Sequence, residues 1–135
     1  MKPRFMLDTN AVSAFMHGRN PSLDQRISAH ARLELCVSAV TYGEISYGLA
    51  LRPEATRLAA AAETLFRLVE IMPWTHEVAQ RYGDMRAALR REGRSLQPLD
   101  MLIAAHALET GTILVSGDGA FRFVPGLSVE NWLDD

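Results

Sequence analysis

The sequence predicts an α/β fold in which helices cover both faces of a central, mostly parallel sheet of about five strands. Short apolar runs alternate with longer segments of helical periodicity along the chain, an order typical of parallel sheets. Proline and glycine separate these segments, most clearly in HGRNP at 17–21 and at Pro53, Pro73 and Gly93. Because no repeat or linker divides the 135 residues, we expect a single domain over residues 1–135.

The expected strands are short and mostly apolar. They lie over 4–7, 33–37, 70–72, 112–116 and 127–132. The expected helices lie over 11–16, 22–31, 41–50, 54–70, 75–92 and 98–109. The two longest are the clearest, because their apolar residues recur every three or four positions. Leu58, Ala62, Leu65 and Val69 form one such stripe, and Val78, Tyr82, Met85 and Leu89 form the other.

The composition excludes several classes of protein. Hydrophobic residues make up 48% and charged residues 22% of the chain, which is typical of a globular protein. The N-terminal residues lack the apolar core of a signal peptide and no window approaches a membrane span, so we expect a cytoplasmic protein. Lys2 is the only lysine among 14 basic residues. A phosphate-binding P-loop and a catalytic lysine inside the chain are therefore excluded.

Four carboxylates fall where strands end or helices begin. Asp8 follows the first strand, and Asp118 follows the fourth. Glu44 lies in the first turns of the helix after the second strand, and Asp100 lies in the first turn of the helix that begins at Pro98. Each alone has a local explanation as a cap, a turn residue or a solvated side chain. In a parallel α/β fold all four would lie at one edge of the sheet. Carboxylates without histidine or cysteine favour magnesium or manganese over zinc.

Four motifs in order then give a resemblance over nearly the whole chain. MLDTN, GEISYG, PLDMLIAAHA and LVSGDGAFRFVPGL resemble the PIN-domain nucleases and, within them, the VapC toxins of bacterial toxin–antitoxin pairs. The resemblance implies a PIN-like three-layer α/β/α fold. It also implies that the four acids form an active site binding Mg²⁺ or Mn²⁺, with the hydroxyls of Thr9 and Ser116 supporting it. Arg86 resembles a family arginine and is a candidate RNA contact.

The function implied by this resemblance is that of a metal-dependent endoribonuclease, the toxin of a type II toxin–antitoxin system. Its substrate would be single-stranded or looped RNA, for example in a structured RNA such as transfer RNA, cut by a metal-activated water. The resemblance further implies neutralisation by a VapB-type antitoxin. A homodimer, a hetero-oligomer with the antitoxin and no membrane association are expected.

Other functions fit the sequence less well. An aspartyl-phosphate phosphatase would need a second acid where Asn10 stands and a lysine further on, and a receiver domain would also need that lysine. A non-catalytic binding module or regulatory protein on the same scaffold is the remaining alternative, since a fold does not determine function. His106 lies six residues after Asp100 and so points away from it. Packing explains this histidine better than metal binding.

Overall fold

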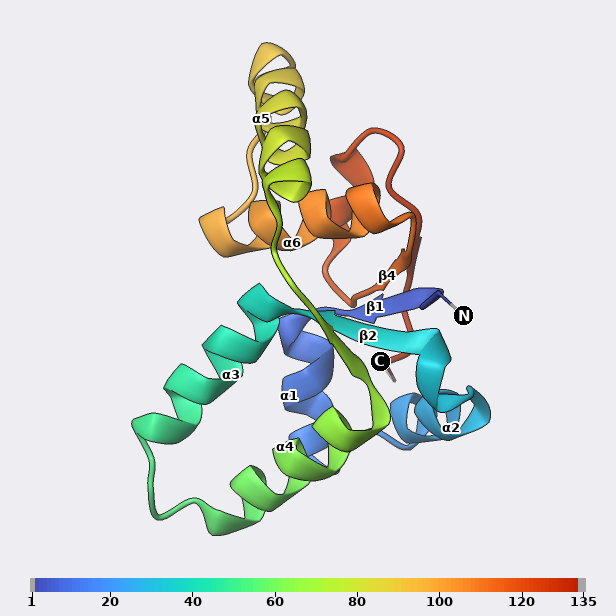
Figure 1. The fold of residues 1–135 in the computed structure, drawn as a ribbon, viewed down its shortest axis with the longest axis vertical. Coiled ribbons are helices and arrows are strands. Elements are labelled where there is room, and N and C mark those ends of the chain that lie inside the picture. The colour runs from blue at the N-terminus through green and yellow to red at the C-terminus, as the bar shows by residue number, and fades with distance from the viewer. Residues whose placement is uncertain (1, 134–135) are drawn as a thin grey trace.

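A computed structural model of the chain describes residues 2–133 and confirms the α/β architecture (Figure 1). The sheet has five strands in the order β3-β2-β1-β4-β5, and every neighbouring pair is parallel. The strands are β1 Phe5–Leu7, β2 Leu35–Ser38, β3 Glu70–Met72, β4 Ile113–Val115 and β5 Val129–Glu130. The two ends of the predicted domain, residue 1 and residues 134–135, lie outside the described residues.

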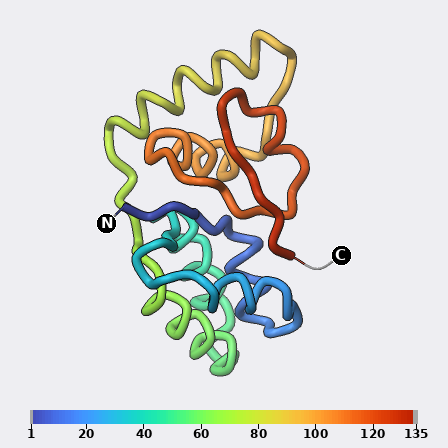
Figure 2. The backbone as a smooth tube through the Cα atoms, turned by 90° about the vertical axis from the view of Figure 1, so that its right-hand side faces the viewer, coloured from blue at the N-terminus to red at the C-terminus, as the bar shows by residue number. Residues whose placement is uncertain are grey.

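Helices form a layer on each side of this sheet (Figures 1 and 2). The six α-helices of the described chain are α1 Thr9–His17, α2 Pro21–Ala29, α3 Ala39–Ala50, α4 Thr56–Leu68, α5 His76–Arg91 and α6 Pro98–Thr110. Two short 3₁₀ helices, η1 Arg32–Glu34 and η2 Gly119–Phe123, precede β2 and follow β4. Within residues 2–133, no helix combines the length and apolar character needed to cross a membrane.

The two layers follow from the alternation of side chains along each strand. In β1, Phe5 and Leu7 face one hydrophobic cluster, which also contains residues of α1, α2, α3 and α4. Met6, between them, faces a second cluster built with α5, α6 and η2. Cys36 of β2 lies in this second cluster and is fully buried, which raises the pKa of its thiol to about 12. The cysteine therefore acts as a small apolar residue, as its position in the sequence suggested.

Several element boundaries differ from the predicted ones, because side-chain caps are local contacts that apolar patterning does not show. The first helix starts at Thr9 rather than residue 11, since Asp8 caps it. The third helix starts at Ala39 rather than residue 41, since the Ser38 hydroxyl accepts from the Val40 N–H. Residues 33–34, predicted as strand, belong to η1, where the Glu34 carboxylate accepts from the Ala31 N–H.

The strand order determines where a ligand fits. Strand β1 is central, paired with β2 on one side and β4 on the other. The chain therefore reverses its direction of winding between β1 and β4, and open parallel sheets bind ligands in the crevice at that point, beyond the carboxyl ends of the strands. Asp8 follows β1 directly, and Ser116 follows β4.

Burial in the first cluster predicts the cost of truncating α4. Leu65 is fully buried, whereas Leu68, one turn later on the same helix, is 40% exposed. We expect Leu65→Ala to lower the free energy of unfolding by about 2–5 kcal/mol. The matched Leu68→Ala should lower it by less than about 1 kcal/mol. Urea denaturation measures both, and equal losses would contradict the packing described.

Candidate functional site

Asp8 ends the central strand and starts the first helix. Its side chain is 2% exposed. Oδ1 accepts a hydrogen bond of 2.8 Å from the N–H of Ala11, and the Asp8 N–H donates to the carbonyl of Val115 in β4. The capping role that its sequence neighbours suggested is therefore present, and it holds the carboxylate at the junction of β1, β4 and α1.

The surroundings of Asp8 raise its pKa from the usual value near 4 to about 6. The main cause is burial, which disfavours the charged form. Hydrogen bonds from the Ser116 side chain and the Ala11 backbone oppose this shift, and the negative charges of Asp100 and Asp118 add to it. The two other acids therefore lie close enough to act on Asp8.

Glu44 comes from the second turn of α3 and is half-buried. Its Oε1 accepts a 2.6 Å hydrogen bond from the hydroxyl of Thr9, at the start of α1. The same hydroxyl lies 3.2 Å from the hydroxyl of Thr41, a fully buried residue of α3. Since a hydroxyl carries one proton, Thr9 donates to only one of these two oxygens at a time, and the shorter contact is the one to the Glu44 carboxylate. The Thr9–Glu44 hydrogen bond therefore holds Glu44 against α1.

Asp100 lies in the first turn of α6, behind Pro98. It is half-buried, and burial raises the pKa of its carboxyl group, with further increases from the charges of Asp118 and Glu44. The charges of Asp118 and Glu44 therefore raise the pKa of Asp100, and those of Asp100 and Asp118 raise the pKa of Asp8. The four carboxylates predicted from separate motifs form one electrostatically coupled group, here called the acid cluster.

Asp118 is the exposed member of the acid cluster and connects to Asp8 through Ser116. The N–H of Asp118 donates to the Ser116 hydroxyl oxygen at 3.0 Å, and the Ser116 side chain in turn lowers the pKa of the Asp8 carboxyl group. Asp118 Oδ1 accepts from the N–H of Ala120 at the start of η2. Ser116 is 2% exposed, so burial and two partners hold it between the two acids.

The acid cluster suits a hard divalent cation in the type of its ligands. All four groups offer carboxylate oxygens, the donors that Mg²⁺ and Mn²⁺ prefer. A cation among them would offset the repulsion that raises the pKa values of Asp8 and Asp100. As the side chains stand, residues 2–133 contain no group of three or more His, Cys, Asp or Glu residues arranged to hold a metal ion.

One buried polar contact near the site has no signal in the motifs. The Nδ1 of His106 in α6 lies 2.7 Å from the Ser38 hydroxyl oxygen, which caps α3, and both residues are fully buried. Burial lowers the pKa of His106, and the Pro73 carbonyl partly opposes this. His106 is thus a neutral packing residue, as predicted, and it joins the helices that carry Asp100 and Glu44.

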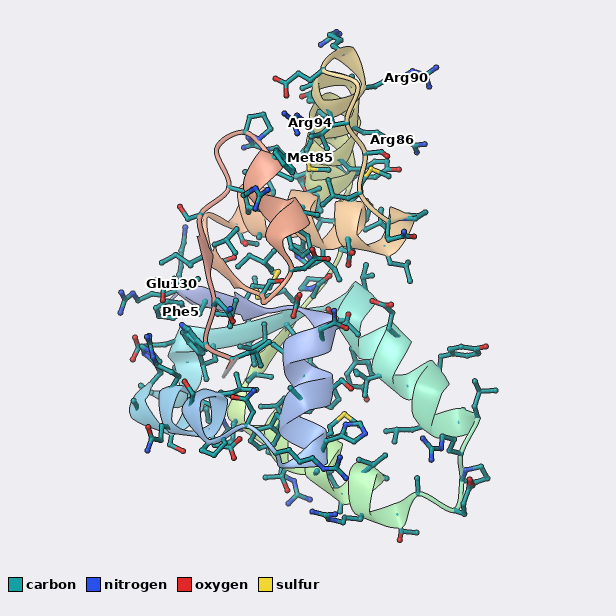
Figure 3. The ribbon with its side chains drawn as sticks, turned by 180° about the vertical axis from the view of Figure 1, so that it is seen from behind. Phe5, Met85, Arg86, Arg90, Arg94 and Glu130 are labelled. Carbon is teal, nitrogen blue, oxygen red and sulfur yellow. The ribbon has the colours of Figure 1, made fainter. Side chains whose placement is uncertain are left out.

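Three arginines line a hollow that also includes Met101, the residue after Asp100. Arg86, the candidate RNA contact, is exposed on α5 and its Nη1 donates a 2.7 Å hydrogen bond to the Tyr82 hydroxyl. Arg86, Arg90 and Arg94, which are labelled in Figure 3, line a small pocket with Ser95 and Met101.

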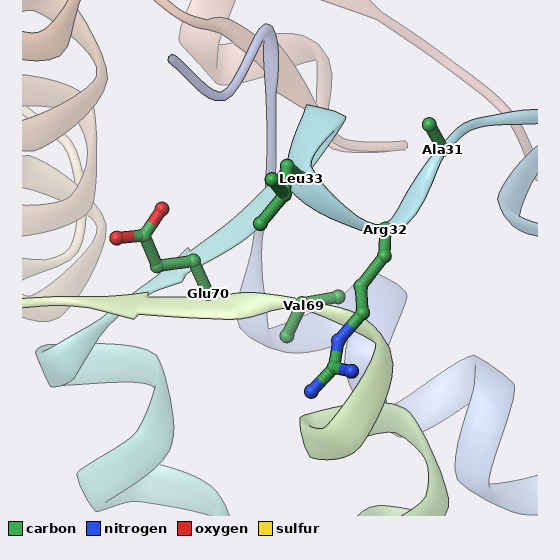
Figure 4. A pocket seen from close by; sticks show the side chains of 5 residues that line it. All are labelled: Ala31, Arg32, Leu33, Val69 and Glu70. Carbon is green, nitrogen blue, oxygen red and sulfur yellow. The ribbon is translucent and has the colours of Figure 1, made fainter. Parts of the chain in front are cut away.

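A larger hollow lies elsewhere and does not include the acids. It measures about 710 Å³ and is lined by Ala31, Arg32, Leu33, Val69 and Glu70 (Figure 4). Ala31, Arg32 and Leu33 precede β2, Val69 precedes β3 and Glu70 begins it, so the hollow is at the amino ends of those strands. The acid cluster follows the carboxyl ends, which are the usual ligand-binding edge of a parallel sheet.

Known proteins resemble this chain in both sequence and fold. The PIN domain family matches residues 5–127. The tRNA(fMet)-specific endonuclease VapC of Shigella flexneri is 32% identical over 130 residues, covering 96% of this chain and 98% of that protein. Ribonuclease VapC2 of Haemophilus influenzae (strain Rd) is 32% identical over 131 residues, covering the same shares.

Solved structures give the same result for the fold. A DNA-bound VapBC structure from Salmonella typhimurium contains a chain with a TM-score of 0.89 and 28% identity, covering 96% of this chain and 98% of that one. A VapBC-1 structure from nontypeable Haemophilus influenzae gives a TM-score of 0.82 at 25% identity, with coverages of 95% and 97%.

The raised pKa of Asp8 predicts a pH-dependent effect of Asp8→Asn on stability. The folded state holds the proton more tightly than the unfolded state, so this group lowers stability as the pH rises from about 4 to about 6. Asparagine keeps the cap without the charge. With chelator present, we expect Asp8→Asn to be more stable by about 2–3 kcal/mol at pH 7 and equal at pH 4. Urea unfolding across this range measures the difference, and a pH-independent one would contradict the assignment.

Proposed function

Because the chain belongs to the PIN-domain family, among its VapC ribonucleases, we propose that Asp8, Glu44, Asp100 and Asp118 form the active site of an Mg²⁺- or Mn²⁺-dependent endoribonuclease. The observation that carries this proposal is the gathering of the four acids at the carboxyl edge of the sheet, where Asp8 is buried and Asp100 feels the charges of Glu44 and Asp118. Such a group is expensive to bury unless a cation shares it. Thr9 and Ser116 are the supporting hydroxyls, each bonded to one of the acids.

The chemistry follows from the donors that the chain provides. A bound divalent ion supplies Lewis acidity, lowering the pKa of a water and the charge on a phosphate. Asp8 is the most constrained ligand, because its backbone and side chain are both held by hydrogen bonds. Asp100 and Glu44 complete the site from α6 and α3, and the exposed Asp118 lies at its outer side. The raised pKa of Asp8 means that ligand binding at neutral pH must also displace the proton from a fraction of the molecules.

The substrate is RNA, and the class favoured is a structured RNA such as transfer RNA. The Shigella flexneri relative is named as a tRNA(fMet)-specific endonuclease, and it matches 96% of this chain. Phosphodiester cleavage at an acidic edge needs cations that receive the polyanion. Arg86 is one candidate, since its guanidinium lies near the start of α6 and is exposed.

The chain acts as the toxin of a type II toxin–antitoxin system, with a VapB-type antitoxin as its partner. The Salmonella typhimurium and Haemophilus influenzae structures that match it are VapBC structures. Large apolar side chains are exposed along α3 and just after it: Tyr42 (41%), Tyr47 (67%) and Leu51 (63%). Beside them, a groove of about 180 Å³ between α1, α3 and α4 includes Glu44 and Arg52. An antitoxin segment seated there would cover apolar surface and approach the acid cluster.

Further expectations belong to the same proposal. The chain forms a homodimer and a hetero-oligomer with the antitoxin, and it functions in the cytoplasm as one PIN domain over residues 1–135. The family match over 5–127 supports the domain assignment.

The central test is metal-dependent cleavage of RNA by the purified chain. Incubated with total RNA and with transfer RNA, it should cleave with Mg²⁺ or Mn²⁺ and not with chelator. Asp8→Asn and Asp100→Asn should each lower the rate at least about 100-fold, because each removes a ligand of the ion. Asp84→Asn, an equal change of charge at an exposed position of α5, is the control and should leave the rate unchanged. Undiminished cleavage by Asp8→Asn would refute the proposed site and favour a contaminating nuclease.

The hydrogen bond from Thr9 to Glu44 gives a second, more selective prediction. Thr9→Val keeps the shape of the side chain but removes the donor, which should lower the cleavage rate about 10-fold by releasing Glu44. Thr9→Ser keeps the hydroxyl and should retain most of the activity. Initial rates at saturating Mg²⁺ compare the two variants. Equal rates for valine and serine would show that the Thr9–Glu44 bond has no role in catalysis.

A further inference from the structure

Two arginines stack on one aromatic ring, that of Phe123 in η2, the short helix that follows Asp118. The Cζ of Arg94 lies 3.9 Å from the centre of the Phe123 ring, and the Cζ of Arg122 lies 4.7 Å from the same centre. Phe123 is half-buried at the end of η2, while both arginines are exposed. The ring thus holds two like charges together, which cation–π attraction stabilises.

The backbone places Arg94 at this position. Helix α5 ends in a Schellman motif, in which Gly93 has a positive φ of 69° and the Arg94 N–H donates to the carbonyl of Leu89 at 2.9 Å. Arg94 therefore turns back at the end of the helix. Arg90, one turn before Gly93, and Arg94 both line the pocket that contains Met101, the neighbour of Asp100. Figure 3 shows Arg90 and Arg94 at this end of α5.

Arg122 lies on the loop that begins with Asp118. Its Nη1 would lie 3.3 Å from a Cβ atom added at Gly119, the residue after Asp118. The cations thus reach from the neighbour of Asp100 to the neighbour of Asp118. Within residues 2–133, Arg90 and Arg122 form no ion pair, and Arg94 has only a 3.9 Å contact with Glu92.

We propose that Arg94 and Arg122, which stack on Phe123, and Arg90, which lines a hollow with Arg94, bind phosphate groups of the RNA strand on one side of the scissile bond. We call these four residues the arginine shelf. The inference rests on the proposed function and adds to it the surface along which the substrate lies. A guanidinium stacked on a ring keeps its N–H donors free at the edge and loses little freedom when it binds a phosphate in bidentate fashion.

A simpler explanation covers part of the shelf. Arg90 and Arg91 lie in the last turn of α5, where positive charge is favoured by the helix dipole. That explanation treats the two residues alike, but Arg90 lines the pocket and Arg91 does not. It also does not account for Arg94 and Arg122, which lie outside the helix and share one ring.

The test measures binding of a fluorescent single-stranded oligoribonucleotide by the Asp8→Asn chain with chelator present, so that no cleavage occurs. Arg90→Gln, Arg94→Gln and Arg122→Gln should each weaken binding about threefold or more. Each should also make the plot of log affinity against log salt shallower by about 0.7, the value for one lost phosphate contact with a single strand. Arg91→Gln removes the same charge at the same helix end and should leave that slope unchanged.

Two further measurements separate a specific shelf from general attraction. Arg94→Lys keeps the charge but loses the planar group over Phe123, so the salt slope should be kept while affinity falls. Poly-L-glutamate stands for an acidic protein partner, and its binding should change less than RNA binding in the glutamine variants.

Three results would overturn the shelf: unchanged RNA binding by its glutamine variants, an equal loss with Arg91→Gln, or a larger loss for poly-L-glutamate. Metal-dependent cleavage by the unmodified chain is scored separately. If that cleavage is absent while the shelf variants still lose RNA affinity, the proposed catalytic function fails and the RNA-binding surface stands.

Discussion

The burial of one carboxylate, that of Asp8, is the constraint on which the rest of the structure depends. A charged group that is only 2% exposed must be held by partners, and the chain supplies them from two directions. The first turn of α1 donates the Ala11 N–H, and Ser116 in the loop after β4 lowers the pKa of the carboxyl group. These bonds do not fully offset desolvation, since the pKa of the group stays raised at about 6. The hydrophobic clusters on the two sides of the sheet provide the stability that tolerates this local cost.

Two helices bring the other inner acids to Asp8, and a buried polar contact joins these helices. Ser38 ends β2, caps α3 and bonds to His106 of α6, so a single hydroxyl orients the helices that carry Glu44 and Asp100. The indole N–H of Trp74, in the segment between β3 and α5, donates to the carbonyl of Leu102 in α6. Polar contacts in a core have strong directional requirements, so they restrict how α3 and α6 can shift relative to each other.

Much of the fold was readable from the sequence, because the signals involved are local. Periodic apolar residues gave both long helices, and the buried stripe Val78, Met85 and Leu89 lies where the pattern predicts. The acids were found because strands and helices of a parallel sheet end at one edge. What the sequence could not give are contacts between distant segments. The His106–Ser38 pair spans 68 positions, and the meeting of Arg94 with Phe123 depends on how η2 packs against the end of α5. The helix starts were misplaced for a different reason, since Asp8 and Ser38 cap these helices through contacts two or three residues away, which apolar periodicity does not show.

Gly117 stands between Ser116 and Asp118, and the C-terminal segment rests directly on it. A Cβ atom at this position would lie 2.8 Å from Cδ1 of Leu133 and 3.6 Å from Oδ1 of Asn131. The side chains of Asn131 and Leu133 therefore lie against the loop that carries Asp118, the outermost acid. A shift of Asn131 or Leu133 would move the backbone at Gly117 and therefore Asp118, although the motif residues themselves stay the same. Relatives that keep all four acids can in this way differ in how firmly the fourth is held, and the cause would lie in a segment that no catalytic motif includes.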